Sequence, residues 1–178
     1  MKQPFKTDLE TIQKRAREKM MDGAVTGAYK ADRQQVVDVL NEVLATEIVC
    51  ILRYRNHYYM ATGINADPVA QEFLQHANEE QMHADWASVR ISQLGGTPNW
   101  NPEGLVTRAH ARYAEGDTLE AMIKEDLVAE RVAIETYSEM IRWLGDDDPT
   151  TRRMIEDILK MEEEHADDLA GLLENLAA

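Results

Sequence analysis

Four long segments with apolar residues at helical spacing restrict the fold of this chain more than any other feature. They cover about residues 32–63, 67–95, 117–145 and 148–175, and no alternating strand pattern competes with them. Each helix would contain about 28 residues and be about 40 Å long. The connections are short, long and short, and a long second connection lets the second and third helices run parallel. The sequence therefore predicts an all-α four-helix bundle with a long crossover between helices two and three.

Aspartates mark the predicted helix starts, and glycines mark most of the ends. The expected caps are Asp32, Asp67, Asp117 and Asp148, and a proline follows the second and the fourth, as is typical of a first helical turn. Within the long connection, residues 97–116, we expect a short helix at about 106–113.

A six-residue phrase occurs twice, once in the second segment and once in the fourth. It reads Glu80-Gln-Met-His83-Ala-Asp85 and, 82 positions later, Glu162-Glu-Glu-His165-Ala-Asp167. The Glu and the His of each copy are three residues apart, so on a helix they share a face and can bind the same cation. A single Glu-x-x-His is most often a solvated helix face, and only the repetition points to a metal.

Each copy also has a matching glutamate about one helix upstream. Glu47 precedes Glu80 by 33 residues, and Glu130 precedes Glu162 by 32. Burying four carboxylates without cations would be very unfavourable, and two divalent cations would neutralise them. Carboxylate and imidazole ligands without a thiolate suit iron or manganese, and zinc less exclusively. The sequence therefore predicts a dinuclear site made of Glu47, Glu80, His83, Glu130, Glu162 and His165.

Two tyrosines repeat with the same offset. Tyr54 follows Glu47 by seven residues, and Tyr137 follows Glu130 by seven. Either they fill the core, or they donate hydrogen bonds to the metal-bound carboxylates. We favour the second role because the offsets match.

The remaining polar residues near these positions have more ordinary interpretations. Asp85 and Asp167 lie two residues after each histidine and therefore point to another face, so we expect surface charge there. Cys50 is expected to be a small core residue. His76 lies one turn before Glu80; it could assist metal uptake, but we favour a structural or surface histidine.

Residues 1–31 differ from the bundle domain at 32–178 and form a separate N-terminal extension. Up to Met21 the extension has three acidic residues and six basic ones, namely Lys2, Lys6, Lys14, Arg15, Arg17 and Lys19. Apolar residues at 9, 12, 16 and 20 predict a short amphipathic helix. Because acids interrupt the basic arm, we favour packing on its own or a neighbouring subunit over contact with DNA phosphates.

Composition limits the class of protein. The formal charge of −14 argues against a nucleic-acid surface on the body of the protein. No apolar run is long enough for a transmembrane helix, and the N-terminus lacks a signal-peptide core, so we expect a cytoplasmic protein. The single cysteine excludes an internal disulfide and a four-thiolate metal site.

The chain resembles the ferritin-like superfamily, and within it the bacterioferritins and the Dps-like proteins with a bacterioferritin-type centre. The resemblance covers about residues 36–175 and rests on Leu-Asn-Glu-Val-Leu-Ala-Thr-Glu47, Glu80-x-x-His83-Ala-Asp, Glu130 and Glu162-x-x-His165. It implies two iron ions per subunit, with Glu47 and Glu130 as terminal ligands and Glu80 and Glu162 as bridges. His83 and His165 would bind one iron each, and Tyr54 matches a tyrosine near the bacterioferritin site.

Two departures from bacterioferritins bear on haem and assembly. Gln81 stands where bacterioferritins carry the haem-binding methionine, and Met82 lies about 100° away on another helix face, so we expect no haem by that mode. The sequence also lacks a segment corresponding to the fifth helix of 24-subunit ferritins and has an added N-terminal extension. Both differences favour a hollow shell of twelve subunits over one of twenty-four.

The resemblance implies a diiron ferroxidase that oxidises Fe(II) with O₂ or H₂O₂ and stores or detoxifies iron in a hollow homo-oligomer. One alternative is a diiron monooxygenase of the ubiquinone-precursor hydroxylase type, which needs an apolar substrate channel and usually a membrane-facing surface. Another is a Dps-like stress protein that protects DNA through the N-terminal arm. The sequence shows no strongly apolar exterior, so the monooxygenase ranks below the ferroxidase.

Overall fold

The computed structural model describes residues 4–64 and 66–177. Within these residues the regular elements are all helical: α1 (Leu9–Ala16), α2 (Arg33–Met60), α3 (Ala66–Gln93), α4 (Leu105–Arg108), α5 (Leu119–Leu144), α6 (Pro149–Ala177) and a 3₁₀ turn at Met20–Asp22. None of the described helices is both long and apolar enough to cross a membrane. Lys2, one of the basic residues of the N-terminal arm, lies outside the described range.

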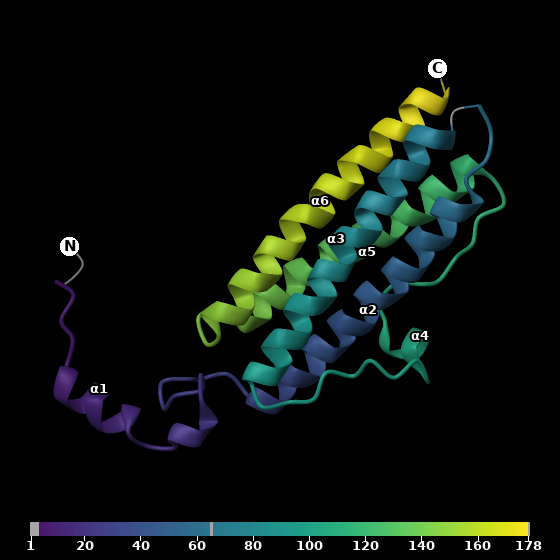
Figure 1. Cartoon of the computed structure of the whole chain (residues 1–178). Helices are drawn as coiled ribbons and strands as arrows, with labels where there is room; N and C mark the ends of the chain where they lie inside the picture. Colours follow the sequence, from purple (N-terminus) through teal and green to yellow (C-terminus); the bar gives the residue numbers. More distant parts are fainter. Residues whose placement is uncertain (1–3, 65, 178) are drawn as a thin grey trace.

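The four long helices form two antiparallel pairs, α2 with α3 and α5 with α6, and the pairs pack into one bundle (Figure 1). The connection from α3 to α5 runs beside α2 for most of its length. Side chains of α2 bind this connection in order: Asn41 contacts Thr97, Arg53 donates to Arg112 O, and His57 contacts Ala114 O. The crossover returns the chain to the end where α3 began, so α3 and α5 run parallel as predicted.

Capping interactions explain where the helices begin, and they correct two of the predicted starts. Asp32 and Asp148 cap α2 and α6 as expected, since their carboxylates accept hydrogen bonds from backbone N–H groups in the first turn. For α5 the cap is Thr118 rather than Asp117, because the Thr118 hydroxyl accepts from the N–H of Ala121. Helix α3 begins at Ala66, which places Asp67 inside its first turn rather than at the cap.

The interior divides into two apolar clusters along the bundle. One surrounds Leu40 and Ile91 near the start of α2, and the other surrounds Phe73 and Leu169 nearer its end. Glu47 lies on α2 between them and is 1% exposed. The apolar stripes of the helices are therefore interrupted at mid-bundle by buried polar groups, and that is where the predicted ligands gather.

The N-terminal extension contains the predicted helix, and this helix does not pack on the bundle of its own chain. Packing on a neighbouring subunit stays a prediction. Helix α1 has no buried residue and stands apart from the bundle, so Phe5 and Leu9 are largely exposed (Figure 1). The following segment is anchored instead: Val25 and Tyr29 pack on the core, and Tyr29 donates a hydrogen bond of 2.9 Å to Asp148. The short helix in the crossover, predicted at 106–113, is the single turn Leu105–Arg108.

Candidate metal centre

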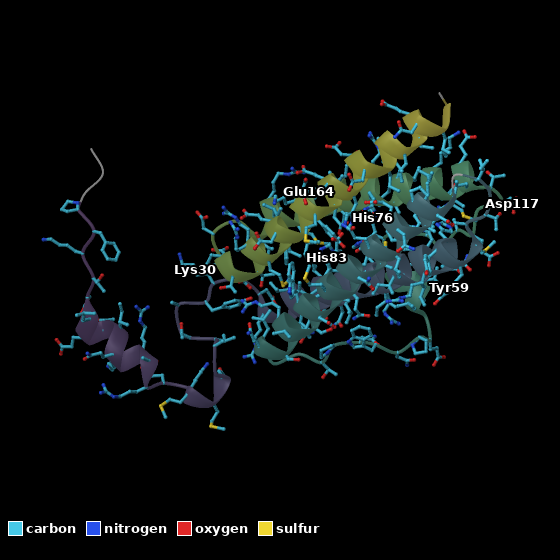
Figure 2. All side chains as sticks on the ribbon, turned by 45° about the horizontal axis from the view of Figure 1, so that its top comes forward. Lys30, Tyr59, His76, His83, Asp117 and Glu164 are labelled. Carbon is cyan, nitrogen blue, oxygen red and sulfur yellow. The ribbon has the colours of Figure 1, made fainter. Side chains whose placement is uncertain are left out.

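The six residues predicted as ligands come together at mid-bundle, one or two from each long helix. Helix α2 contributes one glutamate, α3 a glutamate and a histidine, α5 one glutamate, and α6 a glutamate and a histidine. All six are at most 2% exposed: Glu47, Glu80, His83, Glu130, Glu162 and His165. In Figure 2, His83 lies between the ribbons, whereas Lys30, Tyr59, Asp117 and Glu164 lie at the periphery. We call these six residues the inner cluster.

The inner cluster divides into two overlapping sets of four. In the first set the ligating atoms of Glu47, Glu80, His83 and Glu162 lie within 4.8 Å of one another; in the second set those of Glu80, Glu130, Glu162 and His165 do. Glu80 and Glu162 belong to both sets, and each set has one histidine and one glutamate of its own. This is the arrangement required of two cations that share two bridging carboxylates.

The nitrogen of each histidine faces the carboxylates of its own set. His83 Nδ1 is 3.4 Å from Glu47 Oε2 and 3.3 Å from Glu80 Oε2 and Glu162 Oε1. His165 Nδ1 is 3.4 Å from Glu162 Oε2, 3.6 Å from Glu80 Oε1 and 3.9 Å from Glu130 Oε2.

Three atoms of the second set are buried without a hydrogen-bond partner among the described residues. They are Glu80 Oε1, Glu162 Oε2 and His165 Nδ1. Buried polar atoms are nearly always paired, and leaving several unpaired at one place is unfavourable. All three are satisfied together by a cation at the point where they converge, so the donor set fits a metal ion.

Protonation balances the charge of the inner cluster when no cation is bound. Burial and the neighbouring carboxylates raise the pKa of Glu47 and Glu130 well above the usual range, which favours their neutral, protonated form. Burial opposes the charge on His165, but its contacts with Glu162 and Glu80 outweigh burial and raise its pKa to about 12.

The other three groups complete this balance. The pKa of His83 is also raised, because contacts with three carboxylates outweigh its burial. Despite burial, the pKa of Glu80 is lowered by hydrogen bonds with Glu47 and with both histidines, and the pKa of Glu162 is lowered by both histidines. Two imidazolium ions therefore balance the two carboxylates shared by both sets, and the cluster is neutral overall.

The tyrosines predicted beside the cluster bind across it rather than within their own half. Tyr54, on α2, donates a hydrogen bond to Glu130 Oε1 of α5, and Tyr137, on α5, donates to Glu47 Oε1 of α2. Both rings are fully buried. Each hydroxyl therefore fixes one oxygen of a glutamate, which leaves the other oxygen directed toward the cluster.

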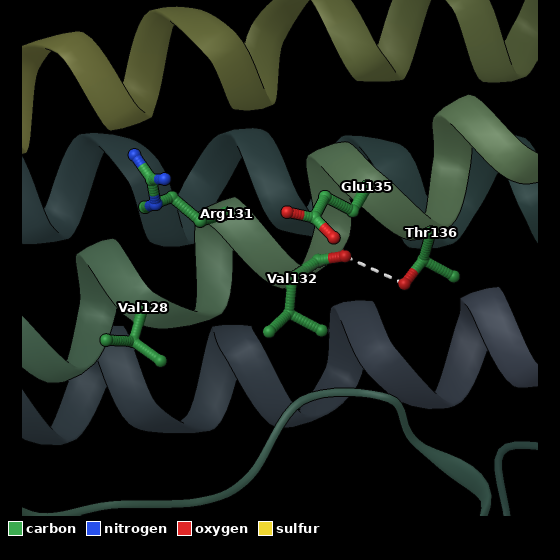
Figure 3. A pocket seen from close by; sticks show the side chains of 5 residues that line it. All are labelled: Val128, Arg131, Val132, Glu135 and Thr136. Carbon is green, nitrogen blue, oxygen red and sulfur yellow. Dashed lines mark hydrogen bonds between the residues drawn. The ribbon is translucent and has the colours of Figure 1, made fainter.

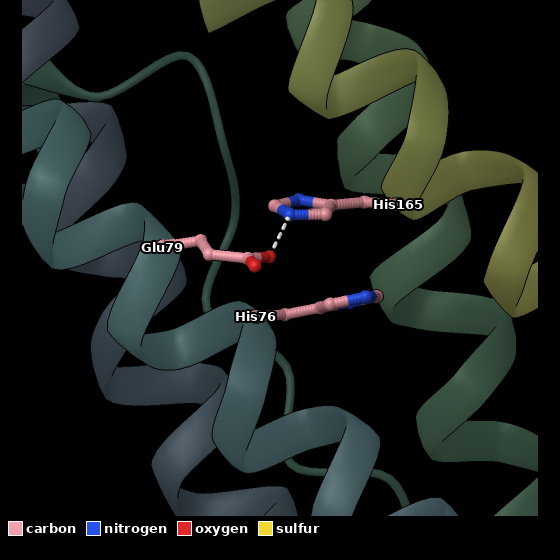
Figure 4. A group of neighbouring side chains, drawn as sticks. All are labelled: His76, Glu79 and His165. Atoms are coloured by element: carbon pink, nitrogen blue, oxygen red, sulfur yellow. Dashed lines mark hydrogen bonds and ion pairs between the residues drawn. The ribbon is translucent and has the colours of Figure 1, made fainter.

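Glu79 is a contributor that the sequence analysis missed. Its Oε2 lies 2.7 Å from His165 Nε2, the nitrogen on the far side of the ring from the cluster (Figure 4). A carboxylate there accepts the Nε2 proton and leaves Nδ1 free to bind a cation. Glu79 directly precedes Glu80 and therefore lies about 100° round the helix from it, on the side toward α6. Its contact with His165 depends on how α3 packs on α6, and residue spacing alone does not predict that packing.

A second buried group missed from the sequence fastens the crossover to the bundle. Arg53 Nε donates to Asp126 Oδ1 at 2.6 Å, and His57 Nδ1 lies 2.7 Å from the other oxygen of Asp126. The same two side chains bind backbone carbonyls of Arg112 and Ala114 in the crossover. These contacts satisfy the buried charges, so this group is structural.

The other residues discussed from the sequence lie outside the inner cluster. Asp85 and Asp167 are exposed as predicted, and Cys50 is a buried free thiol. Gln81 donates a hydrogen bond of 3.1 Å to Asp85 on the outward side of α3. The absence of haem, expected because Gln81 replaces a methionine, stays a prediction. His76 is fully buried, which excludes the surface role considered for it.

The groove along the outer face of α5 does not lead to the inner cluster. It is lined by Val128, Arg131, Val132, Glu135 and Thr136 (Figure 3). Val128 and Val132 are each two residues from Glu130, so they lie on the opposite side of the helix, and both are exposed. The groove therefore offers no apolar path to the carboxylates.

Two relatives of known name are similar to most of this chain. Bacterioferritin of Desulfovibrio desulfuricans is 29% identical over 142 residues, which are 79% of this chain and 75% of the relative. The DNA protection during starvation protein of Pyrococcus furiosus is 30% identical over 141 residues, 75% of this chain and 74% of the relative.

Solved structures show the same similarity. The bacterioferritin-related dodecameric thioferritin of Bacteroides fragilis superposes with a TM-score of 0.79 at 30% identity, over 83% of this chain and 89% of that one. Desulfovibrio desulfuricans bacterioferritin, whose structure contains a diiron site, superposes with a TM-score of 0.72 at 25% identity, over 82% and 81%. A sequence model of the ferritin-like domain matches residues 37–178, and the chain belongs to the ferritin-like family.

Proposed function

We propose that the inner cluster is a dinuclear ferroxidase centre that oxidises Fe(II) with O₂ or H₂O₂. The observation that carries the proposal is the overlap of two four-residue ligand sets in Glu80 and Glu162. Two ferrous ions bring four positive charges to four carboxylates, and nitrogen and oxygen ligands without thiolate suit iron.

Each residue has a defined part in this proposal. Glu47 and His83 bind one ferrous ion, Glu130 and His165 bind the other, and the two shared glutamates bridge them. Tyr54 and Tyr137 hold the outer oxygens of the terminal glutamates. Burial of all six ligands keeps bulk water from competing for the coordination positions.

The bound iron supplies the redox chemistry: each Fe(II) loses one electron, and the pair reduces one O₂ to H₂O₂ or one H₂O₂ to two waters. The protein holds the two ions side by side, so that two electrons are available at one place. We further propose that the oxidised iron is stored or detoxified within the assembly.

An aerobic titration with Fe(II), followed by the absorbance of Fe(III), tests the proposal. Wild type should oxidise iron faster than buffer alone, and Glu47→Ala and His165→Ala should both fall to the buffer rate. Glu164→Gln is a matched control, because Glu164 is exposed on the same turn of α6 and lies outside the cluster. Equal rates in wild type and both ligand variants would contradict the proposal.

For the assembly we propose a hollow shell of twelve subunits. The dodecameric Bacteroides fragilis protein supports it, because it is 30% identical and aligns with most of this chain. Light scattering of the purified protein should give the mass of about twelve 20.3 kDa chains. A mass near that of twenty-four chains, or of a dimer, would contradict this part of the proposal.

A DNA-protecting role is a second candidate, favoured by the exposed N-terminal arm. Helix α1 stands apart from the bundle and carries Lys14 and Arg15 in its last turn. Two relatives are named for DNA protection or DNA binding, at 30% and 26% identity. A salt-dependent gel shift that disappears when residues 1–21 are removed would support this role, and an unchanged shift would exclude the arm. No comparable observation favours the monooxygenase.

A further inference from the structure

A second group of ligating side chains lies next to the inner cluster, with His76 at its centre. His76 is on α3, one turn before Glu80, and is 0% exposed. Its Nε2 lies 3.5 Å from Glu72 Oε1 and 3.8 Å from Asp168 Oδ2. The ligating atoms of these three residues all lie within 4.8 Å of one another. We call Glu72, His76 and Asp168 the outer cluster.

Hydrogen bonding on the opposite side of the His76 ring decides which nitrogen carries the proton. Tyr54 gives its only hydroxyl proton to Glu130, so its oxygen can only accept at the contact of 3.3 Å with His76 Nδ1. Nδ1 is therefore the protonated nitrogen. With the proton on Nδ1, the second nitrogen of the ring, Nε2, presents a lone pair.

That lone pair faces two carboxylates, and no donor lies between them. His76 Nε2 is buried without a hydrogen-bond partner among the described residues. A buried acceptor that faces two further acceptors is unfavourable, because no group compensates for its lost hydration. A divalent cation would be bound by all three groups at once, and one imidazole with two carboxylates suits iron, manganese or zinc.

The outer cluster leads from solvent to the inner cluster. The side chains of Asp168 and Glu72 are 55% and 30% exposed, whereas His76 is closed off. The His76 ring stacks on His165, with ring centroids 4.0 Å apart and an angle of 23° between the planes (Figure 4). The outer cluster thus borders directly on a histidine of the inner cluster.

We propose that Glu72, His76 and Asp168 bind a third divalent cation, separate from the two of the inner cluster and open to solvent. Glu72 and His76 come from successive turns of α3, and Asp168 comes from α6, one turn after His165. The site needs no oxidation and can be tested by binding alone.

The test is an anaerobic titration of the metal-free, full-length protein with Zn(II), with bound zinc counted after dialysis and located by anomalous diffraction. Wild type should bind three zinc ions per subunit, with one anomalous peak beside His76 Nε2. His76→Phe keeps a ring to stack on His165 but has no nitrogen, and it should bind two. Asp168→Asn alters an exposed residue that cannot affect folding strongly, and it should weaken the binding of the third zinc ion at least tenfold.

Asp167→Asn is the matched control, since Asp167 is exposed beside Asp168 but outside the outer cluster, and it should bind three zinc ions. Glu47→Gln, which alters only the inner cluster, should keep the peak beside His76. The proposal is overturned if wild type has no peak beside His76, or if Asp168→Asn and His76→Phe bind the third ion as wild type does. If the third ion is absent but the inner cluster still binds two zinc ions, the proposed ferroxidase is unaffected.

Discussion

Loading the inner cluster with divalent cations is expected to release about two protons per cation. Without cations, four groups of the cluster hold protons that a metal must displace: Glu47, Glu130, His83 and His165. Glu80 and Glu162 are already ionised. Two cations with a combined charge of +4 therefore replace four protons, and the buried cluster stays neutral in both states.

The release of protons fixes the sign and the size of the pH dependence. Because binding releases protons, lowering the pH must weaken metal binding and raising the pH must strengthen it. With about two protons released per cation, each affinity should change about 100-fold per pH unit around neutral pH. The metal affinity of the outer cluster should depend less on pH, because His76 is already neutral there and has no proton to lose.

Calorimetric titration with Zn(II) at pH 7, in two buffers with different heats of ionisation, measures the number of protons released. Glu47→Gln is the informative variant, because its amide has no proton to give and the total should fall by about one. Release of fewer than about one proton per inner cation in wild type would refute the reasoning. The four groups would then already have lost their protons in the metal-free protein.

Four substitutions test other parts of the structure. Gly96→Ala should destabilise the protein by about 1–3 kcal/mol in urea unfolding, because a Cβ there would lie 2.5 Å from a methyl carbon of Val37. Gly171→Ala has open space and should stabilise α6 by up to about 1 kcal/mol; equal effects at the two glycines would contradict the packing. Asp148→Ala removes a helix cap and a buried ion pair and should cost about 3 kcal/mol or more by the same assay, and a loss under about 1 kcal/mol would contradict this role. Tyr54→Phe should weaken Zn(II) binding by about 10–100-fold, and unchanged affinity would show that its hydroxyl does not position a ligand.

The inner cluster was predictable because periodicity encodes it directly. A Glu and a His three residues apart on a helix must share a face, and an apolar stripe through Glu47 or Glu130 requires that face to be buried. When each helix pair carries one such buried set of glutamate and histidine, a four-helix bundle has few arrangements other than bringing the two sets together at its centre. The pairing of Tyr54 with the opposite half was not specified, since the offset of seven fixed a face but not a partner.

Side-chain contacts between neighbouring helices could not be predicted from the sequence. Glu79 reaches His165, and Arg53 reaches Asp126, only because of how neighbouring helices are rotated against each other. Helix starts also shifted locally, as at Thr118, where two adjacent residues can both cap and the backbone conformation decides between them. For α1, the spacing of apolar residues predicted a helix correctly, but amphipathicity does not say whether the chain itself supplies a surface to cover it.

The crossed tyrosines make the two halves of the chain equivalent around the inner cluster. Each helix pair carries one glutamate that belongs to a single set, one glutamate shared by both sets, one histidine and one tyrosine. Each tyrosine donates to the unshared glutamate of the other pair. A hairpin like residues 33–93, associated with its own copy about a twofold axis, would therefore contain every group of the complete centre. A symmetric dimer of such hairpins would be sufficient to build the centre, and fusion of two copies through the crossover would keep it intact. Later divergence would then be easiest outside the inner cluster, and His76 is an example: the matching position before Glu162 is Ile158.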